Sequence, residues 1–275
     1  MHEALQKGDD HKRKIHIIPI AMTSETTFLQ YNGTHRRKIS EAAYQHVPGA
    51  HFVYIDGSKG TGKSSVVTKI LELVSQGKYT SEVSPFREST HDPLAEEKRR
   101  YLREHGANAS QDYVLRLLSA GRQSILERQL ISNLTKENLV LIYNRSFVTT
   151  LAHQLEWIHN RFEAKNKVMT DEDIRTDLGR VLKTAERTFI KPNLAVILLC
   201  DPNTAYQRII NRASGGRDVE SGLSQEHLRR MDLAYRAVSR GIPNSYIIDV
   251  TDVVEPCTTA QQIVTEMEKR RILKR

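Results

Sequence analysis

Short apolar runs alternate with longer stretches of helical periodicity from about residue 50 to the end of the chain. Five of the runs have the length of strands, and two of them, residues 139–143 and 194–200, are continuous enough to be buried in a sheet. The five runs comprise residues 51–56, 82–86, 139–143, 194–200 and 245–249. Because strands that alternate with helices pair in parallel, the pattern predicts an α/β fold with a parallel sheet of about five strands.

Between these runs, apolar positions recur three and four residues apart, which indicates helices with one buried face. Pro93 and Pro202 each follow an aspartate, an arrangement that is typical of the first turn of a helix. Ser110 precedes another helical pattern. The remaining predicted helices cover residues 63–75, 147–162, 171–189, 224–239 and 258–271.

The first 48 residues show no such alternation. Residues 1–14 are polar and charged, which predicts a mobile terminus. Residues 15–20 could form a short strand, which Pro19 would confine to a sheet edge. We therefore divide the chain into a partly mobile N-terminal extension, residues 1–48, and one domain, residues 49–275.

The composition is that of a globular protein. Hydrophobic residues make up 39% and charged residues 27% of the 275 residues, so the chain can bury a core of its own. No apolar run approaches the roughly 18 residues of a membrane-spanning helix, which argues against a membrane protein. Cys200 and Cys257 are too few for a disulfide framework or a zinc site, and this predicts a cytoplasmic or other reducing intracellular compartment.

The chain has 41 basic and 33 acidic residues, and its formal net charge is +8. Such an excess favours an anionic partner, which can be a nucleotide, a nucleic acid or an acidic surface. A basic enzyme has the same composition without any such macromolecular partner, so the charge alone does not choose among these interpretations.

The strongest motif lies between the first strand and the first helix. Residues 57–64 read Gly-Ser-Lys-Gly-Thr-Gly-Lys-Ser, the spacing of a phosphate-binding loop. Backbone amides of such a loop surround phosphate oxygens, Lys63 reaches the β and γ phosphates, and the Ser64 hydroxyl can bind Mg²⁺. The motif therefore predicts triphosphate binding. The predicted contacts are Gly57, Ser58, Lys59, Gly60, Thr61, Gly62, Lys63, Ser64 and Ser65.

Further short motifs follow this loop at strand ends and on the next helices. They are Phe86-Arg87-Glu88, residues 117–123, Asn144-Arg145-Ser146, residues 149–154, Asp201-Pro202, and the segment around Gly215-Gly216. From Val53 to about Ser239 their order resembles the thymidylate kinase and deoxynucleoside kinase family of P-loop kinases. No Asn-Lys-x-Asp motif follows a strand, which argues against a GTPase, and a helicase core usually needs a longer chain.

This resemblance implies a three-layer P-loop NTPase fold with a lid over about residues 213–223. It also implies that ATP and Mg²⁺ are the cofactors, that the acceptor is a nucleotide or nucleoside, and that the protein is a homodimer.

The resemblance also assigns residues to the acceptor. In the family, an arginine matching Arg87 holds the acceptor's phosphate, while a glutamate matching Glu88 is the base for a sugar hydroxyl. An arginine matching Arg122 hydrogen-bonds a thymine carbonyl, and Leu118 stands where the family has a stacking aromatic. The implied acceptor-binding residues are Phe86, Arg87, Leu118, Arg122, Gln123, His153 and Gln154.

A second group of residues is implied in phosphoryl transfer. Arg145 matches the arginine that clamps phosphates between donor and acceptor. Asn144 stands where the family has a carboxylate that helps to hold Mg²⁺, so Ser64 and Asn144 are the implied metal-binding residues. Arg208, Arg212 and Arg217 match lid arginines. The implied catalytic residues are Lys63, Glu88, Arg145 and Arg217, and Arg212 joins the ATP-binding set.

The favoured hypothesis is phosphoryl transfer from ATP to a pyrimidine deoxynucleotide, converting dTMP to dTDP. Arg87 favours the monophosphate as acceptor, whereas the lid segment favours a nucleoside such as thymidine. Asn144 and Leu118 leave open a degenerate kinase fold that binds a nucleotide or a partner without turnover. The net charge leaves open a kinase that acts on nucleic acid.

Overall fold

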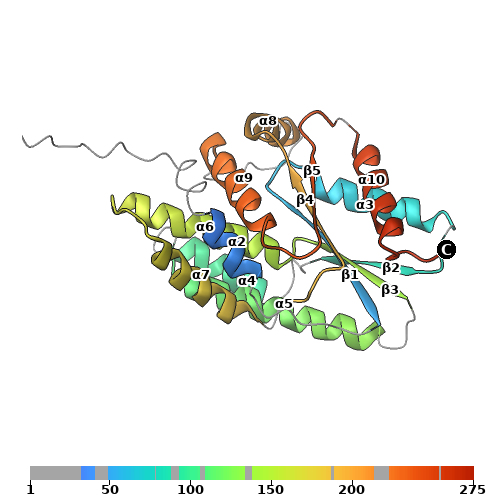
Figure 1. Cartoon of the computed structure of the whole chain (residues 1–275), viewed down its shortest axis with the longest axis horizontal. Coiled ribbons are helices and arrows are strands. Elements are labelled where there is room, and N and C mark those ends of the chain that lie inside the picture. The colour runs from blue at the N-terminus through green and yellow to red at the C-terminus, as the bar shows by residue number, and fades with distance from the viewer. Residues whose placement is uncertain are drawn as a thin grey trace, which may run out of the picture.

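The computed structural model describes residues 32–40, 49–77, 79–87, 93–105, 109–133, 138–186, 189–213, 223–253 and 255–275. In this part of the chain, five parallel strands form one sheet with the order β2-β3-β1-β4-β5 (Figure 1). The strands are β1 (Ala50–Gly57), β2 (Glu82–Arg87), β3 (Leu139–Asn144), β4 (Leu194–Leu199) and β5 (Ser245–Asp249). The predicted fold class and all five predicted strands are confirmed.

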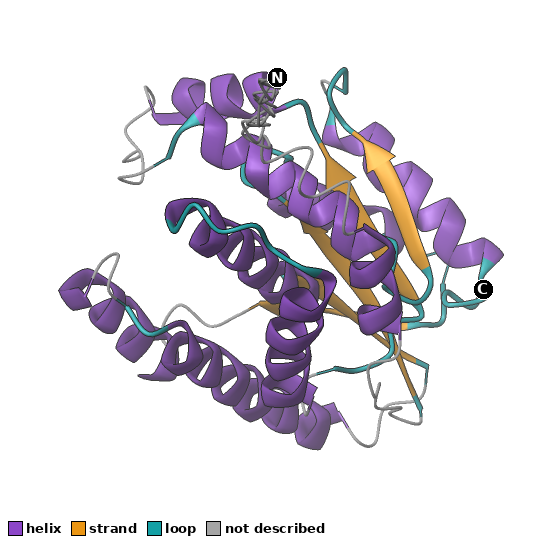
Figure 2. Cartoon of the chain, turned by 60° about the vertical axis from the view of Figure 1, so that its left-hand side comes forward, coloured by secondary structure: helices purple, strands orange, loops and turns teal. Residues whose placement is uncertain are grey.

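Helices cover both faces of the sheet, so the molecule has three layers (Figure 2). One face is covered by α3 and α10, which pack against each other. On the other face, α5, α6, α7 and α9 form the thicker layer. The described helices are α2 (Asn32–Ser40), α3 (Lys63–Ser75), α4 (Pro93–His105), α5 (Gln111–Asn133), α6 (Phe147–Ala164), α7 (Asp171–Ala185), α8 (Pro202–Ala213), α9 (Gln225–Ser239) and α10 (Pro256–Lys269).

Most predicted helix ends lie within two residues of the observed ones, but the helix predicted over residues 171–189 ends at Ala185. Phe189 does not continue that helix. It is buried in the core, with its ring centroid 4.6 Å from that of Phe147. Burial of an apolar ring stabilises the fold more than one additional turn of helix would. Packing of Phe189 therefore decides where this helix ends.

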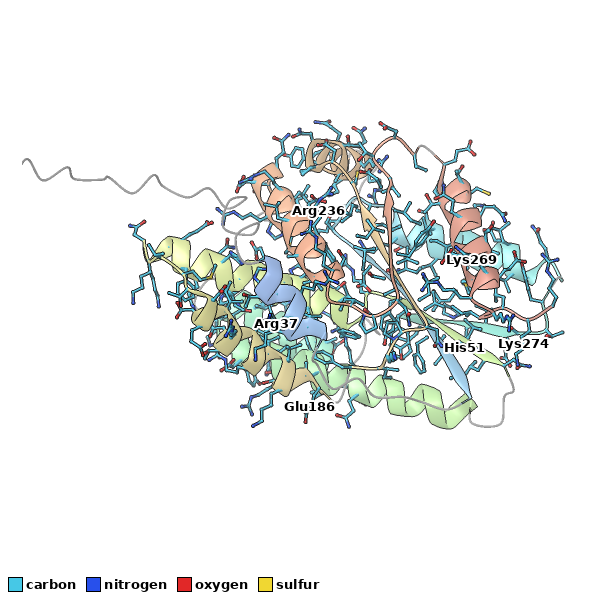
Figure 3. The ribbon with its side chains drawn as sticks, viewed as in Figure 1. Arg37, His51, Glu186, Arg236, Lys269 and Lys274 are labelled. Carbon is cyan, nitrogen blue, oxygen red and sulfur yellow. The ribbon has the colours of Figure 1, made fainter. Side chains whose placement is uncertain are left out.

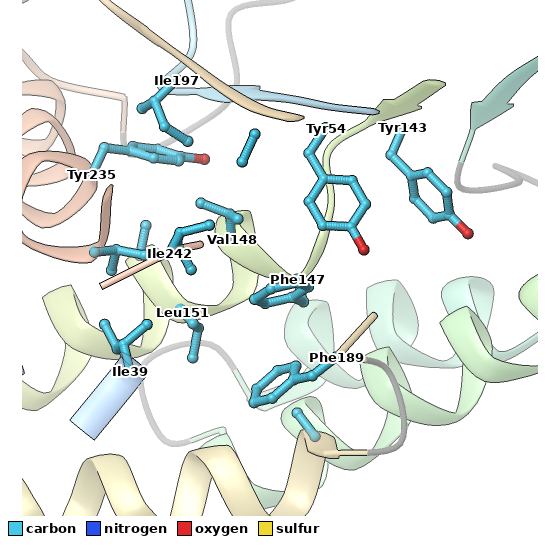
Figure 4. Close-up of a cluster of buried hydrophobic side chains, with 14 of the residues drawn as sticks. Ile39, Tyr54, Tyr143, Phe147, Val148, Leu151, Phe189, Ile197, Tyr235 and Ile242 are labelled. Carbon is cyan, nitrogen blue, oxygen red and sulfur yellow. The ribbon is translucent and has the colours of Figure 1, made fainter. Parts of the chain in front are cut away.

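The side chains of the central strand alternate between the two faces. Phe52 and Tyr54 belong to the hydrophobic cluster under α6 (Figure 4), whereas Val53 and Ile55 belong to the cluster under α3 and α10. All four side chains are at most 1% exposed. A strand buried on both faces reads as a continuous apolar run, which is why the sequence pattern located β1.

The hydrophobic core extends into the first 48 residues. Ile39 of α2 is fully buried in the same cluster as Phe147, and α2 packs on α7 and α9. Gly241 allows this approach, because a Cβ atom there would lie 2.6 Å from the Ile39 Cβ. The Thr34 hydroxyl donates a hydrogen bond to Asp171 (2.7 Å). The mobile terminus and the edge strand predicted for residues 1–20 lie outside the described residues.

The C-terminal residues close the edge of the sheet where the strands begin. The Thr80 amide donates to the Lys274 carbonyl (2.8 Å), and the Lys274 amide donates to the Ser81 hydroxyl (2.9 Å). Lys274 also lies near His51 at the start of β1 (Figure 3). Burial and then the Lys274 charge lower the pKa of His51. The opposite edge, where parallel sheets carry their binding sites, stays available for function.

None of the helices within the described ranges is long and apolar enough to cross a bilayer.

Two histidines meet where α2 docks. The Nε2 atoms of His35 and His159 lie 3.5 Å apart, and both side chains are at most 1% exposed. Burial is the main cause that lowers the pKa of His35 to about 4 and that of His159 to about 3. The charge of His35 lowers the His159 pKa further, whereas Asp171 partly raises that of His35.

We expect this pair to make the stability of the fold sensitive to acid. In the unfolded chain a histidine takes up its proton near pH 6.5, whereas the folded pair stays neutral until about pH 4. The unfolded state therefore binds more protons in this window, and the free energy of unfolding falls as the pH falls through it. The loss is at most about 1.4 kcal/mol for each unit of pKa difference.

Urea denaturation at pH 7 and pH 5 measures this effect. His159→Gln should reduce the difference in unfolding free energy between the two pH values. His105→Gln, which alters an exposed histidine on α4, should leave the difference unchanged. Equal pH dependence in wild type and His159→Gln would show that the pair does not control acid stability.

Candidate active site

The carboxyl ends of the three strands β1, β2 and β3 lie side by side. Their register pairs Arg87 with Asn144, and Asn144 with Ile55. Because the loops that follow these residues leave the same edge of the sheet, three motifs that are far apart in sequence meet there. They are the phosphate loop after β1, Phe86-Arg87 at the end of β2, and Asn144-Arg145-Ser146 after β3.

The phosphate loop is held against β4 and α8 by close backbone contacts. A Cβ atom on Gly57 would lie 2.2 Å from the Leu198 carbonyl oxygen, and one on Gly60 would lie 2.5 Å from that of Ala205. Both glycines also have positive φ angles, 141° and 83°. Only glycine fits such positions, so the motif's glycines are required by packing as well as by the turn. A Cβ atom on Gly62 would have no atom of the described residues within 4 Å, so this side of the loop is open.

Lys63 is buried inside the loop at the start of α3. Its ammonium group donates to the Gly57 carbonyl (2.8 Å) and to the Ser58 carbonyl, and it lies 3.3 Å from the Thr61 hydroxyl. Burial, followed by the charge of Arg145, places its pKa well below the usual value for lysine. The amine thus lies within the loop, bonded to the loop's own oxygen atoms.

Cationic side chains converge on this loop. The charges of Arg145, Arg212 and Lys59 each act to lower the pKa of Lys63, whereas the charge of Asp56 acts to raise it. Burial and then Arg145 lower the pKa of Lys59 too. Like charges held this close repel one another, and a bound polyphosphate would relieve the repulsion. The electrostatics therefore suit a highly charged anion.

Ser64 and Asn144 link the phosphate loop to the end of β3. The Asn144 side-chain amide donates to the Ser64 hydroxyl (3.1 Å), and Ser64 is exposed in the first turn of α3. Both residues offer neutral oxygen ligands, which suit Mg²⁺ when phosphate oxygens supply the negative charge. Across the described ranges, no group of three His, Cys, Asp or Glu residues could hold a metal ion. A metal here would depend mainly on the nucleotide.

Asp56, the last side chain of β1 before the loop, organises a buried network. It is fully buried and accepts hydrogen bonds from the Ser146 amide (3.0 Å), the Ser146 hydroxyl (2.6 Å) and the Thr149 hydroxyl (2.5 Å). Thr149 also lies 3.0 Å from the Tyr235 hydroxyl. Since the single Thr149 proton goes to Asp56, the Tyr235 hydroxyl donates to Thr149. The network joins β1, α6 and α9.

This network sets the position of Arg145. Ser146 is the N-cap of α6, where its hydroxyl accepts a hydrogen bond from the Val148 amide (3.1 Å). Arg145 immediately precedes it with a φ of 74°, an unusual conformation for a residue other than glycine. Its amide donates to the Ile55 carbonyl (3.3 Å). The surrounding contacts hold this strained backbone, and strain of this kind is concentrated at functional sites.

Two of the predicted acceptor residues, Arg122 of α5 and Gln154 of α6, are buried. Arg122 donates to the Thr150 hydroxyl, and both side chains are buried. Gln154, one helical turn after Thr150, is 4% exposed. Phe86 stacks on Tyr143, with ring centroids 3.9 Å apart. Buried polar groups on two facing helices can read hydrogen-bonding atoms of a ligand.

The other predicted acceptor residues lie around this group with more exposure. Leu118 and Gln123 on α5 are half-buried, whereas His153 on α6 is exposed. His153 therefore does not line the buried group.

Several predicted site residues are not brought into this geometry. Glu88, Arg217 and residues 214–222 of the predicted lid lie outside the described residues. Arg208, which the resemblance assigns to the lid, instead donates from its guanidinium to the carbonyls that follow β5. The acceptors are Val250, Thr251 and Val253. Its role is to hold this connection in place.

The residues that the motifs missed are those of the Asp56 network. In the sequence, Asp56 stands out only as the end of a strand, and Tyr235 only as part of a helix. One signal could have found Asp56: an aspartate at the end of a fully buried strand needs partners, because carboxylates are almost never buried unpaired. Its partners are 90 and 93 residues away, and no local pattern names them.

Comparison with known families identifies the chain. Residues 55–260 match the family model of thymidylate kinase. The chain belongs to the thymidylate kinase family. The predicted family is thereby confirmed, and this thymidylate kinase family protein is a nucleoside or nucleotide kinase. No curated protein sequence matches it significantly.

Two solved structures share the fold of this family member. Both are of deoxyadenosine kinase from M. mycoides, one with bound dCTP and the other with the products dCMP and a flexible dCDP. Each is 17% identical, covers 79% of this chain and 99% of its own, and superposes with a TM-score of 0.51. At this identity the likeness concerns the fold.

We expect Asp56→Asn to slow phosphoryl transfer without greatly weakening ATP binding. The amide offers one acceptor oxygen where three donors converge, so Ser146 and with it Arg145 would shift. Loss of such hydrogen bonds should also cost about 1–3 kcal/mol of unfolding free energy. Steady-state kinetics should show a lower kcat, by about tenfold or more, and a nearly constant KM for ATP.

Tyr235→Phe is the control variant, because it removes a hydroxyl that is linked to Asp56 through Thr149 and leaves the three hydrogen bonds of the carboxylate in place, so its effect should be smaller. A folded Asp56→Asn variant with wild-type kcat would show that the network does not position the arginine.

Proposed function

We propose that the protein transfers the γ-phosphoryl group of ATP to a pyrimidine deoxynucleoside monophosphate, with dTMP as the acceptor and dTDP as the product. The observation that carries this proposal is the position of Arg145. Its backbone amide donates to the carbonyl of Ile55 just before the phosphate loop, and the residue lies between Asn144, which is bonded to Ser64, and the N-cap of α6. A fixed arginine between a donor site and an acceptor site can stabilise charge on the transferring group. The family match supports this class of reaction.

On the donor side, the loop amides and Lys63 bind the β and γ phosphates. Lys63 exchanges its carbonyl partners for phosphate oxygens, and the charges of Lys59 and Arg212 add to the attraction. Mg²⁺ would supply positive charge that neutralises the phosphates during transfer. Ser64 and Asn144 would supply its protein ligands.

On the acceptor side, Arg87 at the end of β2 would hold the acceptor's phosphate, since an arginine fork suits that group. Arg122 and Gln154 would hydrogen-bond the base, and Phe86 would contact it. Arg122 only donates, whereas Gln154 donates and accepts, so the pair suits a base with a carbonyl oxygen next to a ring N–H. Thymine has this pattern. Leu118, Gln123 and His153 would complete the surroundings.

A deoxynucleoside is the second candidate acceptor. The sequence around Glu88 and the lid resembles nucleoside kinases, and the two solved structures of similar fold are of a deoxynucleoside kinase. The two reactions differ in their need for a base. A sugar hydroxyl must lose its proton and would use Glu88 as the base, with Arg217 of the lid stabilising the transition state. A phosphate acceptor is already ionised and needs no strong base.

An acceptor screen tests the proposal. ADP formation from ATP would be measured with dTMP, thymidine, dCMP, deoxycytidine and a short DNA strand as acceptors. We expect the highest kcat/KM with dTMP, and no turnover with any acceptor for Lys63→Ala. Faster transfer to thymidine would favour the nucleoside kinase. Turnover only with DNA would favour a nucleic-acid kinase, and ATP binding without any turnover would favour a degenerate kinase fold.

We expect Asn144→Asp to lower the Mg²⁺ concentration needed for half-maximal rate, because a carboxylate binds this ion more strongly than an amide oxygen. Titration of the rate with MgCl₂ at constant ATP gives the value. Asn138→Asp is the matched control, since it adds the same charge at the opposite end of β3. Identical Mg²⁺ dependence in wild type and Asn144→Asp would remove Asn144 from the metal site.

A further inference from the structure

Tyr143 carries a buried hydroxyl that the fold does not use. The residue is 7% exposed, and its hydroxyl oxygen has no hydrogen-bond partner within the part of the chain that the structure describes. Burial raises the pKa of the phenol, so the group stays protonated and able to donate. A buried polar atom without a partner costs about 1–3 kcal/mol. Such an atom in a folded protein calls for an explanation.

The neighbouring tyrosine, Tyr54, shows that a buried tyrosine hydroxyl in this core can find a hydrogen-bond partner. Tyr54 of β1 lies beside Tyr143 of β3, with ring centroids 5.2 Å apart, and both rings extend from the sheet into the helical layer (Figure 4). The Tyr54 hydroxyl donates to the Ile190 carbonyl (2.8 Å). Phenylalanine at position 143 would keep the same packing and avoid the cost of the orphaned hydroxyl. The hydroxyl therefore has another use.

The surroundings of Tyr143 indicate what that use is. Its ring stacks on Phe86 at the end of β2, with an interplanar angle of 18°. The charge of Arg122 acts on the phenol and partly opposes the effect of burial on its pKa. Arg122 in turn donates to Thr150 of α6. The hydroxyl thus lies near Phe86 and Arg122, which the sequence motifs assign to the acceptor. Tyr143 itself is not one of the residues predicted from the sequence.

We propose that the Tyr143 hydroxyl is a further acceptor-binding group that hydrogen-bonds a carbonyl oxygen of the base together with Arg122. Both groups donate, and a carbonyl oxygen can accept from both. A base that presents an amino group there would leave two buried donors unsatisfied and would be rejected. Tyr143 is then a specificity-determining residue for a keto base such as thymine. This inference rests on the proposed function, because it needs the acceptor base beside α5 and α6.

Two single-oxygen deletions test the inference, Tyr143→Phe and the control Tyr54→Phe. For each, the KM for dTMP, the KM for ATP and the free energy of unfolding would be measured. Tyr143→Phe should raise the KM for dTMP about tenfold, which corresponds to one hydrogen bond. It should leave the KM for ATP and the stability unchanged, or make the fold more stable. Tyr54→Phe should lose stability without changing either KM.

Calorimetry of dTMP binding to wild type and to Tyr143→Phe tests the inference without relying on turnover. Weaker binding by Tyr143→Phe supports the inference even if the rate is limited by another step. Unchanged dTMP affinity and an unchanged KM for dTMP in a folded Tyr143→Phe protein would overturn the inference. This holds if the variant is more stable, as expected when the hydroxyl has no partner. It also holds if the variant is less stable, as expected when the hydroxyl is bonded to a buried water. If wild type neither binds nor phosphorylates dTMP or thymidine, the proposed function itself fails, and the inference fails with it.

Discussion

The buried carboxylate of Asp56 is the constraint on which the geometry of the site depends. It ends the central strand and accepts hydrogen bonds from the Ser146 amide and hydroxyl, which belong to the N-cap of α6. Arg145, in its left-handed conformation, lies between Asn144 at the end of β3 and this anchored serine. The same strand continues into the phosphate loop. The buried Asp56 side chain thus fixes the position of the phosphate loop relative to Arg145, the residue that would act on the transferring group. Tyr235 of α9 supports Asp56 through its contact with Thr149.

Charge is the second organising feature. The charges of Lys59, Arg145 and Arg212 all act on Lys63 in the phosphate loop, and the charge of Asp56 opposes them there. The repulsion among these cations destabilises the free protein, and an anionic ligand would relieve this repulsion when it binds. Arg208 shows that position in sequence does not settle such a role, because its guanidinium is occupied by backbone carbonyls after β5. The basic residues behind the net charge of +8 therefore have different roles. Some lie around the phosphate loop, whereas others, such as Arg208, hydrogen-bond the backbone and stabilise the fold.

The helix α2 marks where pattern-based reasoning stops. Its nine residues read Asn-Gly-Thr-His-Arg-Arg-Lys-Ile-Ser, and only His35 and Ile39 among its side chains with described burial are buried. A helix with one buried turn has too few apolar positions to produce a recognisable period. It is stabilised by tertiary contacts with α7 and α9, including the close approach at Gly241. The inner strands β1, β3 and β4, in contrast, are buried on both faces, and the apolar runs predict them at nearly their observed bounds.

The sequence alone determined the sheet and the phosphate loop, because both depend on residues that are adjacent in the chain. A continuous apolar run specifies a buried strand, and the eight residues from Gly57 to Ser64 carry the motif of the loop. The tertiary structure alone decided which side chains meet across the motifs: Asp56 with Ser146 and Thr149, Arg122 with Thr150, and Tyr143 with Phe86. These partners are brought together by strand register and helix packing, which arise from long-range burial and leave no local signal in the chain.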